Sequence, residues 1–539
     1  MRLEDGTVVR SEAPTTTIAE PAGEGTPGWL RLVLAVASGV ALALAFPPFG
    51  WEWTTPLAVA TLTLACRGAR PRMGALLGLV FGLGFLLLLL QWVRVIGVDA
   101  WLALSLIEAL FIAVLGAALT LVTRLRWWPL WAAALWVGVE FARASFPLGG
   151  FPWGRLAYAL DDTPMAALAS LGGVPLVTFV VALAGNVLLW AVVASRRGPV
   201  PRIFAVAVAG ALAFGGLLVP LPTEGIGFAT VAIVQGNVPS KGLEFLGRAR
   251  TVTRNHLEAT EQLMREVRAG KLPKPDFVLW PENSTDIDPF TDAQTRSIVE
   301  QAVQTAGVPV LVGAVLDGPG PNYRRTTGVV WDPTTGPGQI YAKQHPVPFG
   351  EYIPFRRQLL PYIDRLQLVG RDTYAGTEPG KMRIAGYRVG EVICFEVAYD
   401  GIVREVAAGN NSQFLTVQTN NATYTDTGQP QQQFAITRLR SIEYGKATLV
   451  ASPNGISGAI APDGKIVAQS KEATRQVYVE RVPLRTTPTL AARLGPVPEW
   501  VLSLAGLAAI VAALIRRRRP SAGAGPAGPK AQPTGGGSE

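Results

Sequence analysis

Long and nearly uncharged apolar runs between Trp29 and Pro220 constrain the fold of this chain more than any other feature. In a lipid bilayer such runs can span only as helices, because the backbone must satisfy its own hydrogen bonds there. We expect seven spans in this part of the chain and an eighth near its C-terminus, at about 29–46, 53–66, 73–92, 99–122, 127–143, 165–195, 202–220 and 499–515. The chain is therefore predicted to hold a polytopic α-helical membrane domain of about eight spans.

Arginines in the short connections predict the orientation of this domain, because basic residues are retained on the cytoplasmic side of a membrane. Twelve arginines fall in one set of alternate connections, including the run Arg516–Arg519, and three fall in the other set. We therefore expect both termini in the cytoplasm and residues 221–498 outside it. If one short apolar run is instead a buried or re-entrant helix, the orientation of everything after it is reversed.

The two ends of the chain have compositions typical of disorder. Residues 1–28 are polar and rich in Thr, Glu, Gly and Pro, and they lack the pattern of a signal peptide. Residues 516–539 begin with the basic run and continue with Gly, Pro, Ala and Ser. Both segments are expected to be disordered cytoplasmic tails.

Composition excludes several classes of function for this chain of 539 residues. With 49% hydrophobic and 16% charged residues, it is too apolar for an ordinary soluble protein. The net charge of +9 does not predict a nucleic-acid partner, because the basic residues are scattered and their densest run flanks an apolar stretch. The two cysteines, Cys66 and Cys394, exclude a disulfide scaffold and a Cys-rich metal site. Two histidines leave few candidates for a His-built site, so we expect no metal and no cofactor.

Between about residues 225 and 485 the pattern changes to short β-rich runs that alternate with amphipathic helices. This alternation is typical of a compact α/β domain, in which chemistry is usually mounted at strand ends. Three expected strand ends carry residues of interest, Glu282, Lys343 and Cys394. We therefore treat these three as candidate catalytic residues.

Each of the three has a catalytic interpretation and a plainer one. Glu282 follows the apolar run Phe277–Leu279, where desolvation raises the pKa of a carboxyl group toward that of a general base, but a turn or capping acid also fits there. Lys343 can hold a positive charge beside an oxyanion or can be a surface lysine. Cys394 closes an apolar run and is either an inert small hydrophobe or a nucleophile, depending on a neighbouring cation and base.

Together, Glu282, Lys343 and Cys394 form a Glu-Lys-Cys set that resembles the catalytic set of the nitrilase superfamily. The resemblance covers about residues 229–480 and rests on the shared order of further motifs, Val234-Gln235-Gly236-Asn237, Thr419-Asn420-Asn421, Ser452-Pro453-Asn454-Gly455 and Pro462-Asp463-Gly464. It implies an extramembrane α-β-β-α sandwich in which Glu282 deprotonates Cys394. It also implies that Lys343 and the backbone amide of Phe395 stabilise the tetrahedral intermediate.

The membrane domain narrows this resemblance to the apolipoprotein N-acyltransferases, the membrane-embedded branch of that superfamily. The stretch Tyr341–Tyr352 is especially similar to theirs and matches Glu351 to an essential glutamate, while Glu396 matches another. Both are expected to orient the lysine and its loop. The resemblance implies transfer of an acyl chain from a membrane phospholipid, through a thioester on Cys394, to the α-amine of the diacylglyceryl-cysteine of a lipoprotein. It also implies a bacterial cytoplasmic (inner) membrane, with the catalytic domain on the extracytoplasmic side.

Several aromatic residues are candidates for substrate binding, although ordinary core packing is the alternative for each. They are Phe245, Phe349, Tyr352 and Tyr424. The chain departs from the family at four places, with Phe245 instead of a tryptophan, Phe395 instead of a tyrosine, Arg324 or Arg325 at an expected asparagine, and Ala422-Thr423-Tyr424 instead of an aromatic pair. These departures concern substrate preference more than chemistry.

Two other functions are compatible with parts of the sequence. A membrane-bound nitrilase-type amidase or hydrolase would use the same three residues on a small soluble substrate, but one anchoring helix would suffice for it. A transporter or scaffold would carry ionisable residues along its spans, whereas few are present beyond Glu108 and Glu140. We therefore expect an acyltransferase that uses a cysteine nucleophile in a ping-pong reaction.

Overall fold

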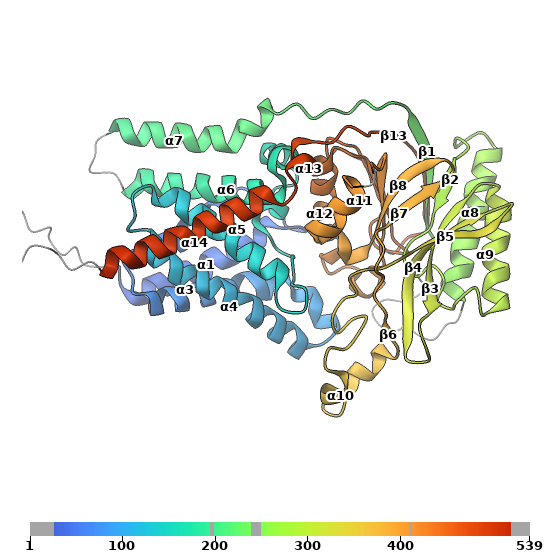
Figure 1. Cartoon of the computed structure of the whole chain (residues 1–539), viewed down its shortest axis with the longest axis horizontal. Coiled ribbons are helices and arrows are strands. Elements are labelled where there is room, and N and C mark those ends of the chain that lie inside the picture. Colours follow the sequence, from blue (N-terminus) through green and yellow to red (C-terminus); the bar gives the residue numbers. More distant parts are fainter. Residues whose placement is uncertain (1–25, 194–198, 239–249, 410, 519–539) are drawn as a thin grey trace, which may run out of the picture.

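The computed structural model describes residues 26–193, 199–238, 250–409 and 411–518, in which a bundle of helices and an α/β sandwich lie end to end (Figure 1). The candidate Phe245 and most of both expected tails lie outside the described residues. The last described helix returns from the sandwich to the bundle, so the sandwich is connected to the bundle at both of its ends.

The bundle contains eight α-helices within the described residues, each at a place where the sequence predicts a span: α1 (Gly28–Ala45), α2 (Thr54–Cys66), α3 (Pro71–Leu89), α4 (Val98–Val122), α5 (Trp128–Ser145), α6 (Ala169–Val193), α7 (Pro199–Phe214) and α14 (Val497–Arg518). Six helical segments of the described chain are long and apolar enough to cross a membrane. α2 has only 13 residues, and α5 carries the buried charges of Glu140 and Arg143. The polytopic helical domain is thus confirmed, while the count of eight spans is approximate.

Small residues let the helices of the bundle approach closely. Glycines recur at every fourth residue of α3, at Gly74, Gly78 and Gly82, and all three face α4. A Cβ added to Gly78 would lie 2.1 Å from the carbonyl oxygen of Ile112, so only glycine fits at this contact. Between membrane helices the hydrophobic effect is absent, and close backbone packing of this kind supplies much of the attraction.

Two β-sheets form the centre of the sandwich. The first has the strand order β13-β1-β2-β3-β4-β5, with β6 paired to β4, and consists of β1 (Phe228–Gln235), β2 (Phe277–Leu279), β3 (Val310–Asp317), β4 (Tyr323–Asp332), β5 (Gly336–Ala342), β6 (Asp372–Thr373) and β13 (Gln476–Pro483). The second has the order β12-β11-β10-β9-β8-β7 and consists of β7 (Lys381–Ile384), β8 (Tyr387–Ile393), β9 (Phe414–Gln418), β10 (Thr448–Ala451), β11 (Gly458–Ile460) and β12 (Ile466–Gln469). Apolar side chains of both sheets, among them Ile233, Leu279 and Ile393, belong to one buried core.

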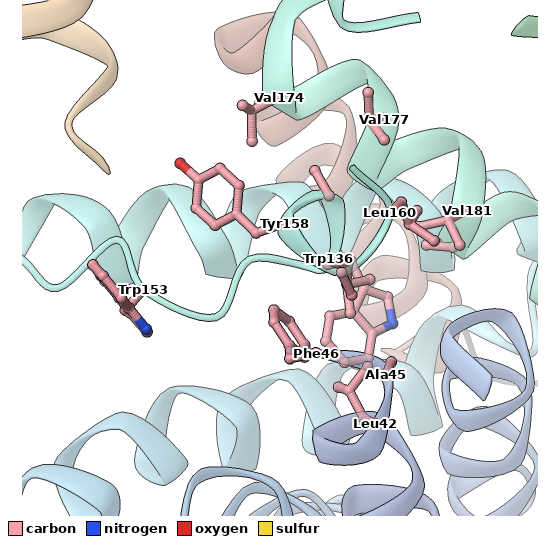
Figure 2. Packing of buried hydrophobic residues seen from close by; sticks show 14 of the residues in the cluster. Leu42, Ala45, Phe46, Trp136, Trp153, Tyr158, Leu160, Val174, Val177 and Val181 are labelled. Carbon is pink, nitrogen blue, oxygen red and sulfur yellow. The ribbon is translucent and has the colours of Figure 1, made fainter. Parts of the chain in front are cut away.

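Helices cover the outer face of each sheet and complete an α-β-β-α sandwich, as predicted (Figure 1). α8 (Thr251–Arg268) and α9 (Ala293–Ala306) pack on the first sheet through a second apolar core. α11 (Asp400–Ala407) and α12 (Gln429–Tyr444) lie between the second sheet and the bundle. Their buried apolar residues belong to the same cluster as those of the bundle, so the two parts of the molecule share one core. Figure 2 shows the bundle side of this core, where Phe46, Trp136 and Leu160 lie close together.

α12 fastens the sandwich to the bundle through several side chains, among them Gln432. The amide oxygen of Gln432 accepts a hydrogen bond from the indole N–H of Trp153 at 2.8 Å. Its amide nitrogen donates to the carbonyl oxygens of Pro47 at 3.1 Å and Leu89 at 3.3 Å. Pro47 follows α1, Leu89 is the last residue of α3, and Trp153 lies in the connection between α5 and α6. One end of the bundle therefore faces the sandwich.

Candidate active site

The three candidate catalytic residues follow strand ends that meet in the sandwich. Strands β1, β2 and β3 run parallel in the first sheet, as β8, β9 and β10 do in the second. Glu282 lies shortly after β2, while Lys343 and Cys394 directly follow β5 and β8. The Lys343 ammonium lies 3.1 Å from Glu282 Oε1, and the Glu282 carboxyl group is close enough to the Cys394 thiol for each to influence the pKa of the other. The structure therefore brings all three residues together.

Cys394 sits in a tight turn between β8 and a 3₁₀ turn, Cys394–Ala398. Its φ angle is +56°, in the left-handed region that residues with a side chain rarely adopt. Strain of this kind is concentrated at functional sites. The turn leaves the cysteine partly exposed and places its sulfur 3.2 Å from the Thr419 hydroxyl, and the nearby backbone of Asn420 favours the charged form of the thiol.

Burial and charge set the protonation of the site. Burial raises the pKa of the Glu282 carboxyl group, and this outweighs the opposing charge of Lys343. Burial alone would lower the pKa of Lys343, but the carboxylates of Glu282 and Glu351 hold it well above its usual value. Burial, and then the charge of Glu282, raises the pKa of the Cys394 thiol. The resting site therefore holds a neutral thiol beside a carboxyl group and a permanent cation.

Glu396 joins the segment after β5 to the end of β8. Its side chain is fully buried and accepts four hydrogen bonds, from the backbone N–H groups of Gln344 (2.7 Å), His345 (3.1 Å) and Ile393 (2.7 Å) and from the hydroxyl of Tyr341 (2.8 Å). Tyr341, Gln344 and His345 lie within two residues of Lys343 in the sequence, and Ile393 directly precedes Cys394. Glu396 thus fixes the lysine relative to the cysteine.

Glu351 anchors the loop that follows the lysine. One of its oxygens lies 2.9 Å from the Lys343 ammonium and also accepts a hydrogen bond from the backbone N–H of Val347 at 2.7 Å. Phe349 and Tyr352 flank Glu351 on the same loop, where Phe349 is 39% exposed and Tyr352 is half-buried. Contact of these two aromatic residues with a substrate stays a prediction.

Aromatic rings of the bundle lie against the turn that begins at Cys394. The Phe395 ring stacks on Trp153 with 4.9 Å between the ring centroids, and on Phe151 at 5.5 Å. Tyr424 packs edge-on against Trp92 of the bundle at 5.1 Å, and it interacts electrostatically with Cys394 and Lys343. The side of the site that faces the bundle is therefore aromatic.

The residues that join the site to the bundle are not predicted from the sequence. Gln429, Gln432 and Gln433 begin α12 and are all buried. Gln433 donates a hydrogen bond to the Thr419 hydroxyl at 2.9 Å. The available signal was the cluster of glutamines itself, since buried side-chain amides require fixed hydrogen-bond partners.

Arg155 lies in the connection between two expected spans and is buried. Its guanidinium pairs with the carboxylates of three helices, at 2.6 Å from Asp400 of α11, 2.9 Å from Glu499 of α14 and 3.4 Å from Glu140 of α5. The available signal was Glu140, because a carboxylate inside an apolar helix requires a partner.

The arrangement brings a thiol, a carboxyl group and a fixed cation to one point, and these are groups that covalent acyl transfer can use. Across the part of the chain that the structure describes, no group of three or more His, Cys, Asp or Glu side chains is placed to hold a metal ion.

Comparison with known proteins agrees with both halves of the architecture. Residues 38–187 match the apolipoprotein N-acyltransferase N-terminal domain, and residues 230–491 match the carbon-nitrogen hydrolase family. An apolipoprotein N-acyltransferase of Mycolicibacterium smegmatis is 38% identical over 515 residues, which are 90% of this chain and 86% of that protein. One of Pseudomonas putida is 31% identical and covers 87% of this chain and 94% of its own length. A solved amidase of the nitrilase superfamily from Nesterenkonia AN1 aligns with a TM-score of 0.36 and 16% identity, over 51% of this chain and 95% of that chain.

The two relatives span the bundle as well as the sandwich, which does not favour the alternative of a membrane-bound amidase. The chain is thus a membrane enzyme that N-acylates lipoproteins, and it belongs to the apolipoprotein N-acyltransferase family.

Proposed function

We propose that Cys394 carries the acyl chain as a thioester between a membrane phospholipid and the α-amine of the diacylglyceryl-cysteine of a lipoprotein. The observation that supports this best is the Glu282–Lys343 ion pair, which interacts electrostatically with the Cys394 thiol beside rings of the bundle. In this proposal residues 221–498 form the catalytic domain. Glu282 is the general base, Lys343 is the cation of the oxyanion site, and the Phe395 amide is its second donor.

In the first step Glu282 takes the thiol proton while the Cys394 sulfur attacks the carbonyl carbon of the phospholipid ester. The charge that develops on the carbonyl oxygen is stabilised by the Lys343 ammonium and by the backbone N–H of Phe395. When the intermediate collapses, the C–O ester bond breaks and Glu282 returns its proton to the departing lysophospholipid oxygen. A C–S thioester bond remains on Cys394.

In the second step the lipoprotein amine attacks the thioester carbonyl, and Glu282 takes a proton from the nitrogen. A C–N bond forms, the C–S bond breaks, and the departing sulfur receives the proton from Glu282. Lys343 stays charged throughout, because its pKa is held well above its usual value. Glu351 and Glu396 are positioning residues, since they hold the lysine and its loop through hydrogen bonds.

The aromatic side of the site explains why an amine rather than water reaches the thioester. Phe395 and Tyr424, with Trp92 and Trp153 of the bundle, provide an apolar surface that concentrates acyl chains and limits solvent. Phe349 and Tyr352 border the same site on the lysine loop and are proposed as further substrate contacts.

In this proposal the sandwich lies on the extracytoplasmic side of the bacterial inner membrane, and the polarity of the bundle supports it. Arg31, in the first turn of α1, donates a hydrogen bond to the carbonyl oxygen of Arg67 at 2.8 Å. The Arg67 guanidinium lies over the ring of Trp128, where α5 begins. Connections rich in arginine therefore gather at one end of the bundle, while the sandwich contacts Pro47 and Leu89 at the other end. The arginine-rich end is the one expected in the cytoplasm.

Reporter insertions test this orientation. Gly270 lies in an exposed turn after α8 of the sandwich, and a second reporter is fused after the C-terminal residue, Glu539. The two reporters are expected on opposite sides of the membrane. Finding both on one side contradicts the orientation.

Intact mass spectrometry tests the chemistry. The purified enzyme is incubated with a phospholipid of known acyl chain length in the absence of a lipoprotein. We expect an adduct on Cys394 whose mass follows the chain length, and none in Cys394→Ala. An adduct that persists in Cys394→Ala, or no adduct in the native enzyme, contradicts the thioester.

A further inference from the structure

The Thr419 hydroxyl has two acceptors for its single hydrogen. Its oxygen lies 3.2 Å from the Cys394 sulfur and 3.2 Å from Oδ1 of Asn421. The side chain is buried, with 1% of the residue exposed, so water does not compete for the hydrogen. The direction of this O–H bond therefore depends on which acceptor is more negative.

The side-chain amides around Thr419 determine which groups donate hydrogen bonds and which accept them. The Gln433 amide nitrogen donates to the Thr419 oxygen at 2.9 Å, so that oxygen already accepts one hydrogen bond and its own hydrogen must point elsewhere. The Asn421 amide nitrogen donates to the side-chain oxygens of Gln433 at 2.9 Å and Gln429 at 2.8 Å. Asn421 is thereby held with its carbonyl oxygen toward Thr419.

Asn421 does not depend on Thr419 for a donor. The Ser452 hydroxyl lies 3.4 Å from Asn421 Oδ1 and itself accepts a hydrogen bond from the backbone N–H of Gly455 at 2.9 Å. Its hydrogen is thus available to Asn421. The Thr419 hydroxyl can leave Asn421 without creating a buried unsatisfied acceptor.

We propose that Thr419 is a catalytic residue that switches its hydroxyl hydrogen bond between Asn421 and the Cys394 sulfur. While the thiol is protonated, the hydroxyl rests on Asn421. When the sulfur becomes a thiolate, before attack or on leaving the tetrahedral intermediate, the hydroxyl turns to it. The O–H bond rotates and is never broken, so no proton is transferred by Thr419. This inference rests on the proposed role of Cys394 as the nucleophile.

The charges around the sulfur explain why a neutral donor is useful. Among the titratable groups around the sulfur, Glu282, Lys343 and Tyr424 interact with it electrostatically, and Glu351 and Glu396 act on the charge of Lys343. Lys343 is the cation of this set, and its charge is already shared between Glu282 and Glu351. Burial and the charge of Glu282 oppose the thiolate. A hydroxyl that donates only when the thiolate forms stabilises it without adding a charge.

The pH dependence of Cys394 alkylation tests this inference without any lipid substrate. Iodoacetamide is applied to the full-length enzyme in a Cys66→Ala background, in which Cys394 is the only thiol, and alkylation is followed by intact mass. Thr419→Val keeps the shape of the side chain and removes the hydroxyl. We expect alkylation below its midpoint to slow about tenfold, with the midpoint shifted to higher pH by about one unit. Thr419→Ser keeps the hydroxyl and is expected to restore the native profile.

Coincident profiles for the native enzyme and a folded Thr419→Val variant overturn the switch. If the valine variant unfolds at the assay temperature, Ser452→Ala carries the test. This change removes the second donor to Asn421 and draws the Thr419 hydroxyl away from the sulfur, so the midpoint should again rise, and an unchanged midpoint overturns the inference. A shifted midpoint in an enzyme that forms no thioester with phospholipid instead contradicts the proposed acyl carrier and leaves the switch intact.

Discussion

The phenyl ring of Phe395 stacks on the indole of Trp153, with 4.9 Å between the ring centroids and 10° between the ring planes. Phe395 directly follows the cysteine in the sandwich, whereas Trp153 belongs to the connection between α5 and α6 of the bundle. The same indole donates a hydrogen bond to Gln432 of α12. The bundle therefore helps to build the active site and is more than an anchor.

Substitution of Trp153 tests this relationship. Trp153→Ala removes the ring under Phe395 and the donor to Gln432, and loss of a fully buried tryptophan costs about 3–5 kcal/mol. Trp153→Phe keeps a ring and should cost about 1 kcal/mol, mainly through the lost hydrogen bond. We expect transfer to fall far more in the alanine variant. Thermal unfolding, and transfer rates at a temperature where both variants are folded, measure these effects, and equal losses would contradict a role for the stack.

Arg155 is expected to be among the most costly residues to replace at the junction. Arg155→Met leaves Glu140 and Glu499 without the cation that they share in a buried site, while Asp400 keeps its pair with Arg440, so we expect a destabilisation of about 3–5 kcal/mol. Arg475 provides a matched control, because its pair with Glu258 is solvent-exposed, with side-chain exposures of 36% and 55%. Arg475→Met should cost within about 1 kcal/mol. Similar unfolding temperatures for the two variants would show that the Arg155 cluster does not hold the parts together.

The membrane helices and the proximity of the three candidate residues could be predicted because each has a local signal. Apolar runs specify membrane helices almost by length alone, and the eight helices lie where they were expected. Glu282, Lys343 and Cys394 each follow a short apolar or β-rich run, and such strand ends are where functional residues of α/β folds are usually mounted. The α-β-β-α arrangement follows from the resemblance that these residues carry.

The contacts between the two parts could not be predicted, because they join residues far apart in the chain. Trp153 and Gln432 are 279 positions apart, and no periodicity in either segment indicates the other. Arg155 lies in a connection between two spans, where an arginine is usually exposed. Only its pairs with Glu140, Asp400 and Glu499 explain its burial. The motif that contains Thr419 could be recognised in the sequence. The contact of its hydroxyl with the sulfur could not, because Gln433 of α12 helps to orient that hydroxyl.

The pH dependence of transfer should reveal the base. Transfer is expected to rise with pH through the pKa of Glu282, because a base must be deprotonated before it can accept a proton. Burial raises that pKa, and the charge of Glu351 raises it further. Glu351→Gln removes this charge, so the pKa of Glu282 should fall and the acid limb of the residual activity should move to lower pH, whatever the loss in maximal rate. Glu258→Gln, on the exposed surface, should leave the limb in place. An acid limb that does not move in Glu351→Gln, or moves upward, contradicts Glu282 as the base.

The order of events separates a transferase from a lipid hydrolase with the same residues. If the acyl chain passes through Cys394, donor and acceptor never occupy the site together, so the kinetics should be ping-pong. Lysophospholipid should then appear before any lipoprotein is added, in an amount close to that of the enzyme. Cys394→Ala is expected to release none.

The fate of the thioester completes this prediction. Its persistence requires that water be excluded until an amine arrives, and the rings of Phe395 and Tyr424, backed by Trp153 and Trp92 of the bundle, provide that cover. The enzyme is loaded with phospholipid labelled in the acyl chain, free donor is removed, and a diacylated lipopeptide is added. Label should move from Cys394 to the peptide amine, and Trp153→Ala should lose part of it as free fatty acid before the acceptor is added. Steady release of labelled fatty acid by the native enzyme without acceptor would instead make water the physiological acceptor and contradict the proposed acyl carrier.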